Sequence, residues 1–156
     1  MKEEICCPEF NKDSWDDKLI NWNNKNFIKG KVPTFLFMPI GYGKVISKLQ
    51  KQIDEKGANI PDYLCLSDHT SKWNMDILLA TSTPIEGANN VTLSGNYYSK
   101  VYEGPFKDTG KWMTDFDNIL KEKNYKSSKL YMWYTTCPKC AKKYGKNYTV
   151  VIAKIE

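Results

Sequence analysis

The stretch Val91-Thr-Leu-Ser-Gly-Asn-Tyr-Tyr-Ser-Lys-Val-Tyr-Glu103 decides the fold class, and Gly104-Pro105 closes it. It is rich in β-branched and aromatic residues, which predicts one long strand with a break at Gly95. A segment of helical apolar periodicity follows over residues 108–123, with Asp108 at the N-cap position. The chain therefore contains a strand that is followed directly by an amphipathic helix, and the same order of elements can be sought in the rest of the sequence.

The first half of the chain repeats the same order of elements without visible sequence similarity. Residues 32–40 predict a strand, residues 44–56 predict a helix that Gly57 ends, and two short strands follow at 63–66 and 75–80. After the second helix, residues 130–135 and 148–153 predict two more strands. We therefore predict an α+β fold of two β-α-β-β modules that form one antiparallel sheet with both helices on one face.

The N-terminal segment, residues 1–31, is polar and has no clear periodicity. Isolated aromatic side chains in a polar run need a surface on which to dock. We therefore predict an N-terminal arm over residues 1–31 that packs on a domain of residues 32–156, anchored by its aromatics Phe10, Trp15, Trp22 and Phe27.

The composition excludes several classes of protein. The chain has 156 residues, about one domain, and its 23 basic residues are all lysine. Without arginine it has no guanidinium for paired contacts with guanine, so we expect no sequence-specific nucleic acid partner. His69 is the one histidine, which rules out a multi-histidine centre, and we assign no metal and no cofactor.

The hydropathy pattern bears on the compartment. No segment reaches the roughly 18 apolar residues that span a bilayer, so we expect no membrane partner. The N-terminus has no apolar signal region, which predicts a cytoplasmic protein whose five cysteines are reduced thiols.

The net charge of +5 lies entirely in the second half of the chain. Many of its lysines surround one predicted hairpin, namely Lys139, Lys142, Lys143 and Lys146. Such a run is typical of a solvated turn, and the alternative is an electrostatic lure for anionic ligands.

Three features together carry a resemblance to a known family. They are the segment Gly95-Asn-Tyr-Tyr-Ser-Lys-Val-Tyr-Glu-Gly-Pro-Phe-Lys107, the following helix with Trp112, Phe116 and Leu120, and a hairpin that contains Cys-Pro. Over residues 32–156 the chain resembles the GyrI-like family of small-molecule (effector) binding domains, which also serve as sensors in multidrug-responsive regulators. The resemblance implies two β-α-β-β modules with a ligand cleft between them, lined by aromatics and an acidic residue.

Within that family the chain is similar to stand-alone members of the hydrolase type. The segments at residues 6–10, 66–76 and 133–148 look like blocks of the cyclopropanoid cyclopropyl hydrolases, which open the strained ring of DNA-alkylating natural products. The resemblance implies binding of planar, largely apolar small molecules, with hydrolysis as the activity. The alternatives are a non-catalytic sensor or sequestering domain and a zinc-clamped protein-interaction module, and the oligomeric state stays open.

Ring opening needs a base that activates water and an acid that protonates the departing conjugated oxygen. We assign Glu103 as the base and Tyr134 as the donor; the alternative for Glu103 is a turn carboxylate that accepts backbone hydrogen bonds. The aromatic residues predicted to bind the ligand are Tyr97, Tyr98, Tyr102, Trp73, Trp133 and Phe37. Strand alternation puts Tyr98 and Tyr102 on one face and Tyr97 and Glu103 on the other, and either face could line the cleft.

Two further constellations offer alternatives. His69 follows Asp68, a pairing that suits acid–base chemistry, although a lone histidine between two strands is more often a hydrogen-bonded loop residue. The zinc alternative rests on four cysteines, because one Cys-x-x-Cys turn presents two thiolates and an adjacent pair could complete a four-sulfur site: Cys6, Cys7, Cys137 and Cys140.

Overall fold

The computed structural model describes residues 11–36, 38–61, 64–135 and 148–155. It has an α+β fold, as predicted. In chain order, its elements are η1 (Lys12–Ser14), β1 (Lys18–Phe35), β2 (Met38–Pro39), α1 (Tyr42–Glu55), β3 (Cys65–Ser71), β4 (Asn74–Ala80), β5 (Asn90–Glu103), η3 (Phe106–Asp108), α2 (Thr109–Glu122), β6 (Ser127–Tyr134) and β7 (Tyr148–Ile155). The residues predicted as one strand at 32–40, however, form the end of β1 and a second strand, β2, that pairs antiparallel with it.

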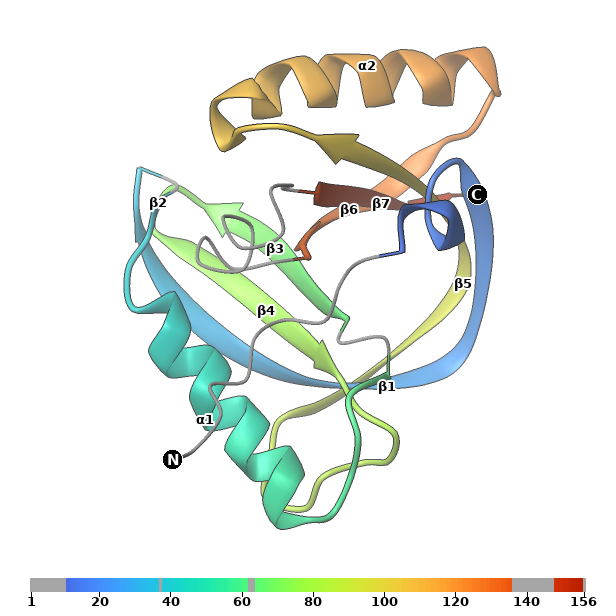
Figure 1. The fold of residues 1–156 in the computed structure, drawn as a ribbon. Helices are drawn as coiled ribbons and strands as arrows, with labels where there is room; N and C mark the ends of the chain where they lie inside the picture. The colour runs from blue at the N-terminus through green and yellow to red at the C-terminus, as the bar shows by residue number, and fades with distance from the viewer. Residues whose placement is uncertain (1–10, 37, 62–63, 136–147, 156) are drawn as a thin grey trace. The chain divides into compact units, whose positions relative to one another are not determined.

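The chain divides into two compact units. The terminal unit comprises Met1–Ile20 and Asn96–Glu156, and the central unit comprises Asn21–Gly95. Each unit contains one α-helix and several strands (Figure 1). The predicted break at Gly95 corresponds to the boundary between units, but strand β5 continues through it, with Gly95 at a φ of 121°.

The first long strand begins earlier than the sequence predicts. Strand β1 starts at Lys18, whereas the pattern placed the strand at residues 32–40 and treated the preceding residues as irregular. The interpretation of residues 18–31 as irregular is therefore wrong. Trp22, Phe27 and Ile28 are buried along this segment, but lysines and asparagines fill the positions between them and hide the alternation.

The central unit places α1 on an antiparallel sheet of strand order β2-β1-β4-β3. Leu49 and Ile53 of the helix pack against aliphatic side chains of the strands, namely Ile28, Val32, Met75, Ile77 and Leu79. Gly30 makes this contact close, because a Cβ built there would lie 2.9 Å from Val45 Cγ1. Helix α1 ends at Glu55, and Gly57 beyond it has a φ of 67°, as expected of a helix stop.

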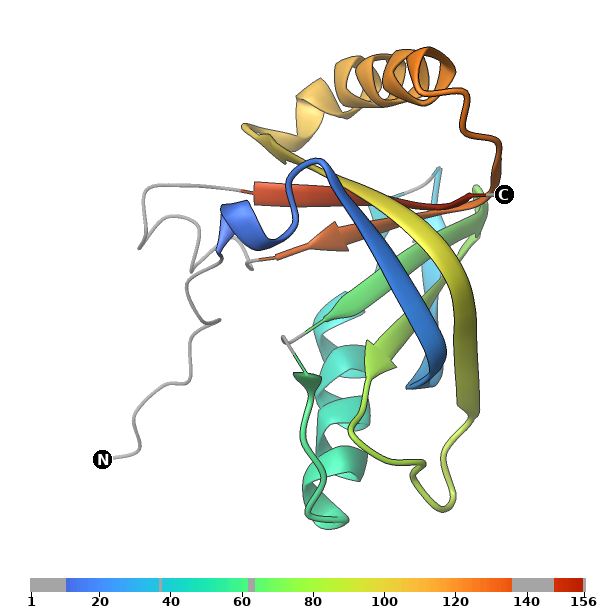
Figure 2. The same cartoon turned by 90° about the vertical axis from the view of Figure 1, so that its right-hand side faces the viewer.

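The terminal unit packs α2 on one side of strands in the order β6-β7-β5 (Figure 1, Figure 2). Phe116 and Leu120 contact Tyr98, Met132 and Val151 of the sheet. Asp108 occupies the predicted N-cap position of α2, but its side chain makes no capping hydrogen bond there. Among the described residues, neither helix has the length and apolar character needed to cross a membrane.

Candidate functional site

The sheet of the terminal unit has two chemically different faces. The cross-strand register pairs Tyr98 with Ala153 and Tyr102 with Thr149, and Tyr134 with the same Thr149. These three tyrosines therefore lie on the face that packs against α2, since directly paired residues share a face. Trp133 and Val101 both pair with Val150, which puts them on the opposite face, and alternation adds three more residues to it: Tyr97, Glu103 and Tyr131.

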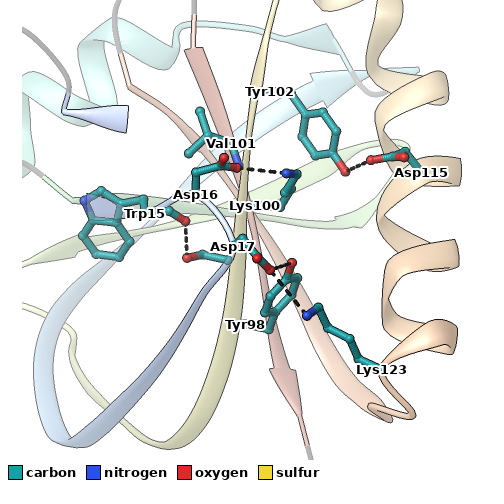
Figure 3. Close-up of polar contacts among 10 residues, drawn as sticks. Trp15, Asp16, Asp17, Tyr98, Lys100, Val101, Tyr102, Asp115 and Lys123 are labelled. Atoms are coloured by element: carbon teal, nitrogen blue, oxygen red, sulfur yellow. Dashed lines mark hydrogen bonds and ion pairs between the residues drawn. The ribbon is translucent and has the colours of Figure 1, made fainter. Parts of the chain in front are cut away.

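On the α2 face, Tyr98 and Tyr102 are held by both ring and hydroxyl. Tyr98 stacks on Phe116 at a ring distance of 5.7 Å, and Tyr102 stacks on Trp112 at 5.8 Å. Their hydroxyls donate to carboxylates, to Asp17 at 2.5 Å and to Asp115 at 2.7 Å (Figure 3). Burial and these carboxylates raise the pKa of both phenols, so both hydroxyls stay protonated as donors.

The structure does not bring the predicted catalytic pair together. Tyr134 is half-buried on the α2 face and packs against the cluster that contains Tyr98, and burial raises its pKa. Glu103 ends β5 on the opposite face, where it is exposed. Glu103 and Tyr134 therefore start from opposite faces of the sheet, at the same end of it.

The direct partner of Glu103 in the register is Tyr148, the first residue of β7. Directly opposite residues have Cβ atoms about 5 Å apart, so the Glu103 carboxylate and the Tyr148 phenol start from neighbouring positions on one face. Tyr148 is not among the residues that the sequence pattern singles out as catalytic. One predicted strand ends at Glu103, and the last predicted strand begins at Tyr148. If these two strands are antiparallel neighbours, both residues lie at the same end of the sheet, and this could have indicated Tyr148 from the sequence.

A pair of tryptophans lies one row further along this face. Trp133 is buried, and Trp15 meets it edge to face at a ring distance of 4.9 Å. The carbonyl of Trp15 accepts a hydrogen bond of 2.6 Å from Ser99 Oγ, which also belongs to this face. Trp15 therefore docks as expected of an aromatic residue in the N-terminal segment.

The segment Trp15–Asp17 passes around the edge of β5 from one face to the other (Figure 3). Asp16 accepts a hydrogen bond from the Val101 amide at 3.1 Å and pairs with Lys100 at 3.2 Å. Asp17, at a positive φ of 55°, accepts the Tyr98 hydroxyl on the α2 face and pairs with Lys123 at 3.6 Å. The bond from Tyr98, followed by the nearby lysines, lowers the pKa of Asp17.

The remaining predicted residues lie elsewhere or outside the described part of the chain. Tyr97 is fully buried on the face of Trp133, and burial raises its pKa. It lies six positions from Glu103 along β5, about 20 Å, so it is too far away to be the acid partner. Trp73 belongs to the turn between β3 and β4 in the central unit, with its ring 5.7 Å from that of Phe35. Phe37 lies outside the described residues.

His69 and the cysteines complete the set of sequence-predicted candidates. His69 lies on β3 opposite Met75, and burial lowers its pKa while Asp68 acts in the other direction, so the imidazole is neutral at neutral pH. All four cysteines of the zinc alternative lie outside the described residues. Within the described part of the chain, no group of three or more His, Cys, Asp or Glu side chains could hold a metal ion.

The fold is shared with solved structures of low sequence identity. A hydrolase from Listeria innocua aligns with a TM-score of 0.63 and 11% identity over 90% of this chain and 92% of that one. A hydrolase encoded by lin2189 of the same organism aligns with a TM-score of 0.62 and 12% identity over the same shares. The C-terminal domain of EcmrR aligns with a TM-score of 0.63 and 10% identity over 91% of this chain and 98% of that domain.

The family model for bacterial hydrolases matches residues 1–155. The chain therefore belongs to the bacterial hydrolase family. No curated protein matches the chain.

Proposed function

We propose that the protein binds a planar, largely apolar small molecule on the face of the terminal unit opposite α2 and hydrolyses it. The observation that carries this proposal is the placement of Glu103 and Tyr148 side by side, one row from the Trp133–Trp15 pair. Membership of the bacterial hydrolase family supports the reaction class.

The two tryptophans suit stacking of a flat ligand. Successive residues on one face of a strand are about 7 Å apart, so a ring that stacks at the row of Trp133 brings its edge to the row of Glu103. Aromatic pairs prefer ring distances of about 4.5–7 Å, and Trp15 already contacts Trp133 in this range. Trp133 is buried and Trp15 is partly exposed, so an entering ligand would contact Trp15 first and would reach Trp133 only by displacing it.

The acid–base roles follow from the two side chains beside the aromatic pair. We propose as substrates the cyclopropanoid alkylating compounds that the GyrI-like resemblance suggests. Glu103 takes a proton from water, and the water oxygen bonds to a carbon of the strained ring. The ring C–C bond breaks, its electron pair moves to the conjugated oxygen, and that oxygen receives the proton of the Tyr148 phenol.

The proposal includes the finer features that the resemblance implies. These are the two-module GyrI-like arrangement with its ligand cleft and a role in detoxification. A reducing compartment such as the cytoplasm fits the free, buried thiol of Cys65. The alternative is a sensor or sequestering domain that binds the ligand without hydrolysing it. The experiment below distinguishes this alternative from catalysis.

The test measures binding and turnover of a cyclopropanoid alkylator separately. We expect Glu103→Gln to reduce turnover by at least about a hundredfold while binding stays within about threefold, because the amide keeps the shape of the side chain but cannot accept the proton. Tyr148→Phe should act in the same direction. Chromatography of the ring-opened alcohol gives turnover, and quenching of tryptophan fluorescence gives binding.

The control variants are Tyr102→Phe and Tyr134→Phe, which remove phenols from the α2 face. Both should leave turnover within about threefold if the face of Glu103 carries the reaction. Loss of turnover in Tyr134→Phe alone would move the reaction to the α2 face. Tight binding by the wild-type protein without product would establish a sequestering domain and refute the hydrolase.

A further inference from the structure

Four exposed large apolar side chains of the central unit lie in and beside the β1–β2 and β3–β4 turns. Phe35, Leu36, Ile40 and Trp73 expose 59%, 55%, 54% and 57% of their surface. We call these four residues the hairpin patch. Soluble proteins rarely gather large exposed apolar side chains in one place without a binding role.

The backbone holds the hairpin patch in a fixed arrangement. The Thr34 amide donates to the Trp73 carbonyl at 3.0 Å, and the Thr34 hydroxyl donates to the Lys72 carbonyl at 2.7 Å. The Ile40 amide donates to the Pro33 carbonyl at 2.8 Å, which closes the β1–β2 hairpin. The two Thr34 bonds join the end of β1 to the β3–β4 turn, and the rings of Phe35 and Trp73 lie 5.7 Å apart.

The charge near the hairpin patch is mainly basic. From Lys31 to Ile53 the chain contains four lysines and no acidic residue, and Lys72 directly precedes Trp73. Lys44 and Lys72 are exposed, and Lys44 lies in the first turn of α1, a turn without acidic side chains whose free amides add positive potential. Asp76, the nearest acid along β4, is already paired with Lys29 at 3.8 Å.

We propose that the hairpin patch binds the surface of an anionic lipid membrane. Aromatic and aliphatic side chains at a turn enter the boundary between headgroups and acyl chains, and flanking lysines attract anionic headgroups. A protein bound in this way lies on the membrane surface and needs no helix that spans the bilayer. The sequence-based expectation of no membrane partner considered spanning segments only.

The lysines also argue against a second copy of the chain as the occupant. A two-fold dimer through the hairpin patch would bring the same surface of each copy together. Lys44 and Lys72 would then come close to the same lysines of the partner copy, and juxtaposed like charges are unfavourable. An anionic membrane complements both parts of this surface, because its acyl chains can contact the apolar side chains and its headgroups can contact the lysines.

The experiment is vesicle flotation with the full chain at low salt. We expect binding to vesicles of mixed phosphatidylcholine and phosphatidylglycerol, no binding to phosphatidylcholine alone, and release as salt rises. The double variant Phe35→Ser with Trp73→Ser should reduce the bound fraction about tenfold or more. Its matched control is Leu19→Ser, because Leu19 is 63% exposed but lies in the terminal unit, and this variant should bind as the wild type does.

A second pair of variants tests the charge. Lys44→Glu with Lys72→Glu should abolish the preference for anionic vesicles, whereas Lys126→Glu, an exposed position after α2, should keep it. Failure of the wild type to bind mixed vesicles, or equal binding by the patch variants and the controls, would overturn the proposal. So would a concentration-dependent dimer in sedimentation that the patch variants dissociate, since the patch would then be a protein interface.

Discussion

The two helix–sheet contacts of the molecule use the same order of elements but different chemistry. Helix α1 packs on the central sheet through aliphatic side chains and the close approach at Gly30. Helix α2 packs on the terminal sheet through stacked aromatic rings whose hydroxyls donate to carboxylates. A contact between aromatic rings buries more area, but the tyrosine hydroxyls in it need hydrogen-bond partners. The same order of strands and helices is therefore compatible with an aliphatic and with an aromatic helix–sheet contact.

The largest expected effect is the loss of an aromatic anchor. Phe116→Ala should reduce the free energy of unfolding by about 3–5 kcal/mol, because it leaves a cavity under Tyr98 and removes the stacked ring. Ile53→Ala, its counterpart at α1, should cost about 2–4 kcal/mol. Urea denaturation of both variants measures the difference. An equal or larger cost for Ile53→Ala would show that the aromatic contact contributes no more than the aliphatic one.

A smaller effect should come from filling the close approach in the central unit. Gly30→Ala should destabilise by about 1–3 kcal/mol, because its Cβ would lie within 2.9 Å of Val45 and 3.1 Å of Leu49. Gly110→Ala is the control, since a Cβ there meets nothing within 4 Å and Gly110 lies inside α2. We expect it to be neutral or stabilising by up to about 1 kcal/mol. Similar thermal unfolding of both variants would contradict the close packing of α1.

The smallest expected effect is the loss of a tyrosine hydroxyl that donates to a carboxylate, and this effect depends on pH. Tyr98→Phe should cost about 1 kcal/mol at neutral pH, and Tyr102→Phe less, because Asp115 is exposed. The Tyr98 bond lowers the pKa of Asp17 below 3.8, so its contribution is present above that pH and is lost as pH falls through the lowered value. Urea denaturation should show the gap between wild type and Tyr98→Phe narrowing below pH 3.8. A gap that stays constant down to pH 2 would show that Asp17 does not carry it.

The sequence predicts the elements of this protein better than their pairing. Helical spacing gives α1 and α2 to within two residues, because each buries one apolar stripe. The start of β1 escapes prediction, because its buried positions Trp22, Phe27 and Ile28 are spaced irregularly among lysines and asparagines. The local sequence pattern predicts which residues of β5 alternate between the two faces of the sheet. It does not predict which residues of β6 and β7 share each of those faces.

The candidate site illustrates the same limit. Alternation correctly separates Tyr98 and Tyr102 from Tyr97 and Glu103. The predicted strand ends place Glu103 and Tyr148 at the same end of the sheet, but their direct pairing depends on the register between residues 45 positions apart, which no local pattern encodes. Trp15 is foreseeable as a docked aromatic, whereas its contact with Trp133 depends on how the segment turns at Asp17.

The hydrogen bond from the Val101 amide to Asp16 has a consequence for aggregation. An amide on the outer side of a strand is a template to which a strand of another molecule can add. Here a carboxylate, itself paired with Lys100, takes the place of the incoming carbonyl. A strand from another molecule would have to displace Asp16 first. The segment Trp15–Asp17 therefore blocks the addition of a strand at this amide of β5.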